Sequence, residues 1–432
     1  MSTRQPRLLS RRSLIAGAGA LGLAACGRSG PDAPLRFWAI GGEGAAVEEL
    51  LLPFRKEQPA LRLQIEKLPF SAAHEKLLTA FAGDSTPDIA QLGNTWIAEL
   101  AALGALEPLQ PWVDAIGLPS ADYFEGVWRT NLIGGQLYGV PWYVDTRLLF
   151  YRRDLLARAG FASMPGDWPG VVKALQALQR HGTPHPLLLP LTEPEPLLAL
   201  ALQQDEPLLR DGDRYGNFRG AGFQRALRFY LDRFASGEAP YLTGNEIQNM
   251  WQEFGRGTFA AFISGPWNIG ELDRRLPPAM KDSWGTAPMP RFANGAGADG
   301  PGASTAGGSS LVVFRRSQRK PDALKLLAYL SRPEVQLRFH ALTGDLPPRR
   351  STWQSPALAG DPRSTAFRQQ LDNVKPTPAV PEWERIAQEM QLFATRAQRY
   401  GTPVPEICAA LDERVDGFLT KRRWMLDRAR NA

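Results

Sequence analysis

The sequence predicts an α/β protein that folds into two lobes. Residues 35–40, 61–65 and 88–92 are short apolar or alternating segments typical of strands, and segments of helical spacing separate them. A strand–helix–strand–helix–strand order favours parallel pairing with helices packed on the sheet. The chain has 432 residues, and chains of this length divide into two lobes with one core each.

Two loops at the ends of predicted strands are candidate ligand-binding segments. Gly41-Gly42-Glu43 follows the first strand, and residues 93–96 follow the strand at residues 88–92. In open α/β sheets, ligands bind beyond the carboxyl ends of the strands. Residues 47–54 and 74–82 keep helical spacing, and Pro53 is expected to kink the first of these helices.

The second half of the chain continues the alternation of strands and helices. A Gly/Ala-rich segment, residues 293–310, is predicted as a loop before a strand at residues 311–314. Helical spacing predicts further helices at residues 223–234, 321–330, 383–400 and 405–419.

The first 25 residues have the features of an export signal that is removed from the mature protein. Four arginines and no acidic residue accompany an apolar run, residues 14–23, which is too short to span a membrane. Residues 10–14 resemble a twin-arginine signal, and Leu-Ala-Ala-Cys resembles a lipobox, in which the Cys26 thiol is acylated. We therefore expect a signal peptide over residues 1–25 and a lipid-anchored tether over residues 26–34, with an unprocessed anchor as the alternative.

The net charge of the mature protein is expected to be small. It is +6 for the whole sequence and falls to +2 without residues 1–25, which hold four arginines and no acidic residue. The basic tail at residues 421–423 is expected to be a solvated helix end, so we expect no nucleic-acid partner. With Cys26 acylated, Cys408 has no disulfide partner, and the hydrophobic core must hold the protein together.

One stretch concentrates aromatic and charged side chains. Trp142, Tyr143, Asp145 and Arg147 lie within six residues, before an apolar run. Because side chains alternate along an extended segment, the last three are expected on one face. A ring, a carboxylate and a guanidinium suit a hydroxyl-rich ligand, with the ring on its C–H face and the charged groups on its hydroxyls. An ordinary strand with a surface ion pair is the alternative.

Motifs of enzymes and cofactor sites are missing or misplaced. GAGALG at residues 17–22 matches the dinucleotide fingerprint but lies in the signal segment, and GAGADG at residues 295–300 opens no helix. The sequence has no GxSxG elbow, and its four histidines do not cluster with cysteines as metal ligands. Carboxylate pairs such as Glu193 and Glu195 occur, but a glycosidase needs two carboxylates facing across a cleft, which a sequence does not show. We expect no cofactor, no metal and no catalytic residue.

Tryptophan is frequent, with 12 residues in the chain. Trp38, Trp96, Trp142 and Trp267 fall at predicted strand ends or loops and not at helical spacing. Each is therefore a candidate for ligand binding as well as for the core.

Several longer motifs occur together in one order along the chain. They are Gly-Asn-Thr-Trp, VPWYVDTRLLFYRRDLL, FGRGTFAAFISGPW, Gly-Gly-Ser before KPDALKLLAYLSRPEVQ, and TGDLPPR. From about residue 35 to the C-terminus, the chain resembles the extracellular solute-binding proteins of carbohydrate ABC transporters, of the maltose/trehalose-binding type.

The resemblance implies a type II periplasmic-binding-protein fold, with two α/β lobes built from interleaved segments around a hinge. Residues 35–144 and 284–333 would form lobe 1, and residues 148–280 and 334–432 would form lobe 2. The chain would cross between lobes near residues 144–148, 280 and 333, and the lobes would close on a sugar.

The resemblance also implies roles for individual residues. Glu43 would accept hydrogen bonds from sugar hydroxyls, Tyr143 and Asp145 would bind from the hinge, and Trp267 would stack under a sugar ring. The amides of Gly307 and Gly308 would approach the ligand closely, which glycine permits, and Arg349 would donate to hydroxyls. The further candidates are Asn94, Trp96, Trp142, Arg147 and Asn268.

The function implied is that of a monomeric, membrane-anchored receptor outside the cytoplasm. It would capture a di- or oligosaccharide, maltose or trehalose in the first place, and deliver it to an inner-membrane ABC permease. Ile269 stands where some relatives carry a second aromatic residue, which favours a disaccharide. Two alternatives remain: a binding protein for a non-sugar solute, such as a polyamine or glycerophosphodiester, and a secreted glycoside-active enzyme.

Overall fold

The computed structural model describes residues 33–113, 115–190, 193–241, 249–292 and 300–430. The predicted signal peptide and the predicted lipidation site, Cys26, lie outside these residues. Within these ranges, no helix is both long and apolar enough to cross a membrane.

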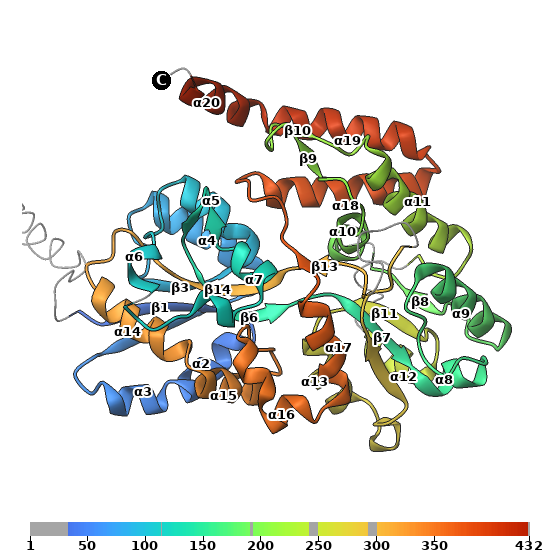
Figure 1. The fold of residues 1–432 in the computed structure, drawn as a ribbon, viewed down its shortest axis with the longest axis horizontal. Helices are drawn as coiled ribbons and strands as arrows, with labels where there is room; N and C mark the ends of the chain where they lie inside the picture. Colours follow the sequence, from blue (N-terminus) through green and yellow to red (C-terminus); the bar gives the residue numbers. More distant parts are fainter. Residues whose placement is uncertain (1–32, 114, 191–192, 242–248, 293–299, 431–432) are drawn as a thin grey trace, which may run out of the picture.

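The described chain forms two lobes that lie side by side (Figure 1). Each lobe has its own β-sheet, surrounding helices and hydrophobic core. The two-lobed α/β fold predicted from the sequence is therefore confirmed. Two cores are the expected solution for a chain of this length, because single cores stop growing beyond about 250–300 residues.

The sheet of the first lobe has five strands in the order β2-β1-β3-β14-β6. Their bounds are β1 (Leu35–Ile40), β2 (Leu63–Leu68), β3 (Ile89–Gly93), β6 (Val140–Asp145) and β14 (Gly307–Val313). β1 pairs in parallel with β2 and β3, as predicted, and β14 runs antiparallel between β3 and β6. The segment predicted as a loop up to residue 310 is therefore strand from Gly307 onward.

Helices pack around this first sheet. The longer ones are α2 (Glu43–Leu50), α3 (Leu52–Glu57), α4 (Phe70–Ala82), α5 (Ile97–Ala102), α14 (Lys320–Leu330) and α15 (Pro333–Thr343). Shorter elements are η1 (Asn94–Trp96), α6 (Gln110–Val113), η2 (Ser120–Asp122), α7 (Glu125–Arg129), β4 (Leu132–Ile133) and β5 (Gln136–Leu137). The single kinked helix predicted around Pro53 is two helices, because a proline in the first turn of α3 removes no intrahelical hydrogen bond there.

The sheet of the second lobe has four strands in the order β12-β7-β11-β8. Their bounds are β7 (Leu148–Arg152), β8 (Leu187–Leu188), β11 (Ala261–Ser264) and β12 (Trp284–Ala287). β7, formed by the apolar run after the hinge, is buried along its whole length and pairs antiparallel with β11 and β12. Two short strands, β9 (Leu209–Arg210) and β10 (Tyr215–Gly216), form a separate hairpin.

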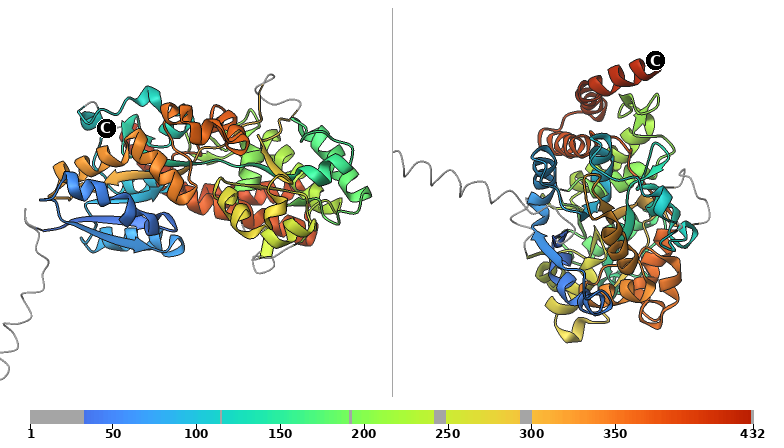
Figure 2. Two further views of the ribbon diagram at one scale, coloured as in Figure 1. Left: turned by 90° about the horizontal axis from the view of Figure 1, so that it is seen from below. Right: turned by 90° about the vertical axis from the view of Figure 1, so that its left-hand side faces the viewer.

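The helices of the second lobe come from the middle and the end of the chain. They are α8 (Arg153–Arg158), α9 (Trp168–Arg180), α10 (Glu195–Leu202), α11 (Ala221–Ala235), α12 (Met250–Arg256), α13 (Trp267–Arg275), α16 (Pro356–Ala359), α17 (Pro362–Leu371), α18 (Trp383–Tyr400), α19 (Val404–Phe418) and α20 (Thr420–Arg430). Two further 3₁₀ turns are η4 (Pro278–Met280) and η5 (Arg350–Gln354). α18 and α19 lie along the second lobe, and α20 extends from the end of α19 (Figure 2).

The chain passes between the lobes at three places. β6 leads into β7 through residues 146–147, and residues 288–306 lead from β12 to β14. The chain crosses again after α15. Beside the first crossing, β13 (Ser304–Thr305) pairs in parallel with β15 (Val374–Lys375), which gives the hinge a short ladder of its own.

Two of the predicted lobe boundaries differ from the structure. Residues 284–287, which we assigned to lobe 1, form β12 and pair with β7 in lobe 2, where Trp284 stacks near Phe150. Residues 334–343, which we assigned to lobe 2, belong to α15, and its residues Val335 and Phe339 are buried in the core of lobe 1. The sequence shows where these elements lie but not which sheet they join, because that choice depends on pairing with strands distant in the sequence.

Candidate functional site

Tyr143 lies at the centre of a buried hydrogen-bond network between strands. Its hydroxyl accepts hydrogen bonds from Ser309 Oγ of β14 at 3.0 Å and from Gln91 Nε2 of β3 at 3.4 Å. Gln91 is held in turn by the backbone N–H of Ile40, which donates to its Oε1 at 2.8 Å. The carboxylate of Glu43 also hydrogen-bonds Tyr143. Three adjacent strands thus fix the position of one ring at the edge of the sheet.

Three carboxylates gather around this ring. Glu43 begins α2 just beyond β1, Asp145 ends β6, and Asp345 follows α15. Burial raises the pKa of Glu43, and the nearby charge of Asp145 acts in the same direction. Burial also raises the pKa of Asp345 well above its usual value, and the charges of Glu43 and Asp145 add to the effect. Burial and mutual repulsion of the three carboxylates thus both favour the protonated form of Glu43 and Asp345.

Arg147 connects the hinge to the second lobe. Its Nη1 donates to Asp145 Oδ1 at 2.5 Å, and its Nη2 lies 3.8 Å from Glu195 Oε1 of α10. The guanidinium carbon lies 4.8 Å from the centroid of the Trp267 ring. The prediction that Asp145 and Arg147 share one face agrees with this pair.

Trp267 begins α13 of the second lobe and keeps 37% of its surface exposed. It packs directly over Gly265, where a Cβ atom would overlap both the indole ring and the Asp145 carboxylate. Glycine at this position therefore lets a ring of the second lobe approach a carboxylate at the end of the first-lobe sheet. The result is an exposed aromatic face beside charged groups from both lobes.

Further carboxylates of the second lobe face the same region. Burial raises the pKa of Glu193 against the opposing charge of Arg147, and Asp145 and Glu195 lie near enough to raise it further. Burial raises the pKa of Glu384 at the start of α18, although Thr95 of the first lobe hydrogen-bonds this carboxyl. A cavity of about 340 Å³ adjoins Thr95 on the first-lobe side.

The arrangement favours a ligand that donates hydrogen bonds. Around Arg147, carboxylates outnumber the single guanidinium, and such groups accept from hydroxyls. The half-exposed indole offers an apolar plate for C–H groups. Within the described residues, no group of three or more His, Cys, Asp or Glu side chains is placed to hold a metal ion.

Three predicted binding residues are used inside the protein instead. Trp142 is 1% exposed and stacks on Phe339 in the core of the first lobe, at a residue where the register between β6 and β14 shifts. Asn268 is 1% exposed, and its amide is satisfied by Ser264 and Trp251. We also predicted that Arg349 contacts the sugar, but its guanidinium already hydrogen-bonds groups of the protein.

The guanidinium of Arg349 is bound at both ends. Its Nε donates to Asp122 Oδ2 at 2.6 Å, and its Nη1 donates to the Ser331 carbonyl at 2.9 Å. These bonds tie the segment after α15 to η2 of the first lobe. Arg349 therefore stabilises the junction of the chain segments through its Nε and Nη1.

The remaining predicted residues lie at the first-lobe edge. Asn94 accepts from Ser310 Oγ at 2.8 Å, while its buried Nδ2 has no protein partner. Trp96 is buried against Phe70 and His74.

Gly307 and Gly308 are required by the neighbouring strand. They pair with Asp145 and Val144 of β6. A Cβ on Gly308, whose φ is +119°, would overlap the Tyr143 carbonyl, and a Cβ on Gly307 would lie 2.6 Å from the Asp145 carbonyl. Close approach of a ligand to the amides of Gly307 and Gly308 stays a prediction, and the structure adds that glycine is needed here for the close approach of β6.

Several residues of the site were not predicted. Gln91 and Ser309 orient Tyr143, and Asp345 adds a carboxylate. Glu195 and Glu384 of the second lobe lie near Arg147 and Thr95, respectively. Glu195 was noted only as one of many carboxylate pairs. Gln91 is a polar residue inside an apolar strand, and this sequence signal could have identified it as a site residue.

Known proteins share the fold described above. The model of the bacterial extracellular solute-binding protein family matches residues 39–337. The chain belongs to this family. In this solute-binding protein, charged and aromatic side chains from both lobes meet around Trp267, Asp145 and Arg147, a region that we call the crevice.

Individual relatives include proteins that bind sugars. The solved structure of the sugar-binding protein MalE from the phytopathogen Xanthomonas citri is 52% identical, covers 91% of this chain and 99% of that chain, and superposes with a TM-score of 0.87. The diacetylchitobiose binding protein DasA of Streptomyces coelicolor is 24% identical over 95% of this chain and 99% of its own. The galactooligosaccharide-binding protein of Bacillus subtilis is 23% identical over 86% of this chain and 88% of its own. The resemblance stated from the sequence motifs is thereby confirmed, since the chain belongs to the solute-binding family and is similar to members that bind sugars.

Proposed function

We propose that this protein is the receptor of an ABC importer for a di- or oligosaccharide, with maltose or trehalose as the preferred ligand. The observation that carries the proposal is the exposed Trp267 ring beside Asp145 and Arg147, with Asp145 in turn near Glu43, which hydrogen-bonds Tyr143. Similarity to a sugar-binding protein at 52% identity supports the same class of ligand.

Each group would have a distinct part in binding. The Trp267 indole would cover the C–H face of one sugar ring, while Asp145 and Glu43 would accept hydrogen bonds from its hydroxyls. Arg147 would donate to a hydroxyl or ring oxygen without leaving its ion pair, because the guanidinium has five N–H donors. Glu195 and Glu384 would add acceptors from the second lobe.

Binding would couple to closure of the lobes. Trp267 and Glu195 belong to the second lobe, whereas Glu43 and Tyr143 belong to the first, so a ligand that contacts all four stabilises the closed arrangement. The closed, loaded form would be recognised by an inner-membrane permease. The protein would act without a cofactor, as a monomer, and would not transform the sugar.

The test is calorimetric titration of the purified chain with maltose, trehalose, maltotriose, lactose and glucose. We expect one of the two named disaccharides to bind with a dissociation constant of about 1 μM, since one stacked ring and two or three charge-assisted hydrogen bonds leave about −8 kcal/mol after the costs of association. Absence of heat with every sugar would refute the proposal. Recovery of the intact sugar after long incubation separates a receptor from a glycoside-active enzyme.

A cationic solute is the second candidate, because the crevice has more carboxylates than cations. A polyamine would bind mainly through ion pairs, so its affinity would fall steeply with added salt, whereas that of a neutral sugar would change little. Spermidine and maltose titrated at low and high salt therefore distinguish the two ligand classes. An anionic glycerophosphodiester is disfavoured by the same carboxylates.

We also propose that the chain is exported and anchored by a lipid on Cys26. The Leu-Ala-Ala-Cys motif after a short apolar run supports this. Replacement of Cys26 by serine would move the protein from the membrane fraction to the soluble extract of cells, with sugar binding unchanged. Equal membrane association of both forms would contradict the anchor.

A further inference from the structure

The C-terminal helix α20 has two faces of different character. The face toward the body is held to the β9–β10 hairpin: Arg422 Nε donates to the Asp213 carbonyl at 3.1 Å, and Arg423 Nη1 donates to the Arg214 carbonyl at 3.0 Å. Asp427 on the same face forms an ion pair with Arg214. These contacts fix the rotation of α20 about its own axis.

The opposite face of α20 is exposed and combines apolar with cationic side chains. Lys421, Trp424, Met425 and Arg428 follow one another at i, i+3, i+4 and i+7, which places them in one stripe about 100° wide. Trp424 is 56% and Met425 51% exposed, and both belong to the small set of large apolar side chains left open in the described chain. The Arg428 guanidinium lies 4.6 Å from the Trp424 ring centroid.

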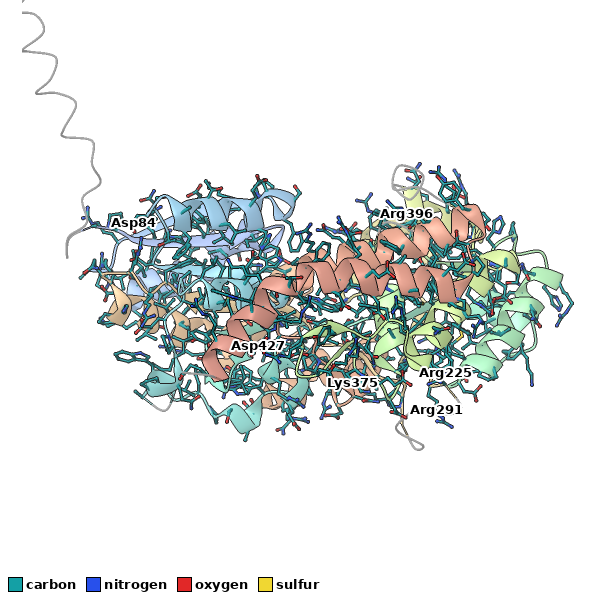
Figure 3. The ribbon with its side chains drawn as sticks, turned by 90° about the horizontal axis from the view of Figure 1, so that it is seen from above. Asp84, Arg225, Arg291, Lys375, Arg396 and Asp427 are labelled. Carbon is teal, nitrogen blue, oxygen red and sulfur yellow. The ribbon has the colours of Figure 1, made fainter. Side chains whose placement is uncertain are left out.

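The position of α20 leaves this stripe open to a large flat partner. The helix extends beyond the end of α19, away from both sheets (Figures 1 and 2). Asp427, which marks its body-facing side, is labelled on this helix in Figure 3. The stripe faces away from the hairpin that holds the helix.

The charges and apolar side chains of the stripe favour one kind of binding partner over another. A second copy of the chain would bring Lys421 and Arg428 against the same cations, which is unfavourable without an acidic counterpart. An anionic membrane surface offers many phosphate charges for the two cations. It also offers an interfacial zone in which the apolar surfaces of tryptophan and methionine are removed from water.

We propose that the exposed stripe of α20, formed by Lys421, Trp424, Met425 and Arg428, is a docking surface for anionic lipid headgroups. The cations provide attraction to the surface, and Trp424 enters the headgroup region. A single short helix with two cations binds such a surface weakly and reversibly, so its binding is measurable at low salt. The attachment becomes stronger when another part of the same molecule is also held at the membrane.

The contact would also orient the receptor. α20 is joined to α19 of the second lobe, so docking through its stripe would fix the direction in which that lobe stands on the membrane. The basic tail at residues 421–423, expected from the sequence to be merely solvated, thus divides into Lys421 on the docking face and two arginines that hold the helix in place.

The experiment is co-sedimentation of the mature chain, residues 26–432 with Cys26→Ser to remove any acyl group, on vesicles of phosphatidylglycerol and phosphatidylethanolamine. We expect binding at low salt, at least tenfold less on pure phosphatidylcholine vesicles, and loss of binding at high salt. Lys421→Glu with Arg428→Glu should abolish sedimentation, and Trp424→Ala should weaken it severalfold.

The control is the pair Arg55→Glu and Lys56→Glu on α3, which makes the same change of net charge on the first lobe. This variant should sediment as the parent does. If both charge variants lost vesicle binding equally, net charge alone would explain the binding, and the proposal would be overturned. Absence of parent sedimentation on anionic vesicles would also overturn it and would point to an acidic protein surface as the occupant. Unchanged thermal midpoints in all variants show that the comparison concerns folded protein.

Discussion

Replacement of Trp267 by alanine tests the proposed binding site most directly. The side chain keeps 37% of its surface exposed, which for a residue of about 250 Å² leaves about 90 Å² open to a ligand. A sugar ring that covers about 60 Å² of this surface gains about 1.5 kcal/mol at about 25 cal/mol per Å². We therefore expect the dissociation constant for the preferred sugar to rise about twelvefold, measured by titration calorimetry.

The matched control is Trp424→Ala, which removes a more exposed tryptophan far from the crevice. It should leave sugar affinity unchanged, and both variants should retain the thermal midpoint of the parent to within a few degrees. If Trp267→Ala binds the sugar within twofold of the parent, the indole is not the plate on which the ring stacks, and the assignment of the crevice is wrong.

The remaining predictions concern stability without sugar. Asp345→Asn should raise the free energy of unfolding at pH 7. In the folded protein the pKa of Asp345 is raised above 3.8, so the protonated carboxyl favours folding at low pH. This stabilisation is lost as the pH rises through the raised pKa, whereas an asparagine stays neutral. The gain should vanish in melts near pH 3.5, and a gain that persists there would contradict the sign. Arg233→Ala leaves a carboxylate that is 1% exposed without its cation and should cost about 3 kcal/mol in urea unfolding, whereas Arg256→Ala, at a surface pair, should cost under about 1 kcal/mol. Gly308→Ala should cost at least about 2 kcal/mol of stability, because Gly308 has a φ of +119° and a Cβ would overlap the Tyr143 carbonyl. Gly42→Ala has open space around its Cβ and should change stability by less than about 1 kcal/mol. Equal costs for the two variants would refute the steric argument.

The sequence contained enough to predict the fold class and part of the site. Period-two and buried apolar segments located β1, β3 and β7, and the motif order indicated interleaved lobes. Alternation along β6 could not place Trp142, because the register with β14 shifts at this residue and its ring packs, like that of Tyr143, against Phe339.

Other features depend on contacts between distant segments. β12 joins the second sheet because Trp284 packs beside Phe150, and no local pattern encodes that choice. Asp345 and Glu384 reach the crevice only after the third crossing has folded back between the lobes. Arg349 resembled a ligand contact by motif, yet its guanidinium is occupied by Asp122, more than two hundred residues earlier.

The position of β14 in the first sheet has a consequence for biogenesis. This strand lies between β3 and β6, so that sheet has a gap in its middle until residue 313 has been synthesised. The first-lobe strands made before it must wait with unpaired edges, a state open to chaperones and to aggregation. Maturation of the first lobe is thus a late event of translation, which leaves a long interval in which the nascent polypeptide can be committed to a secretion pathway.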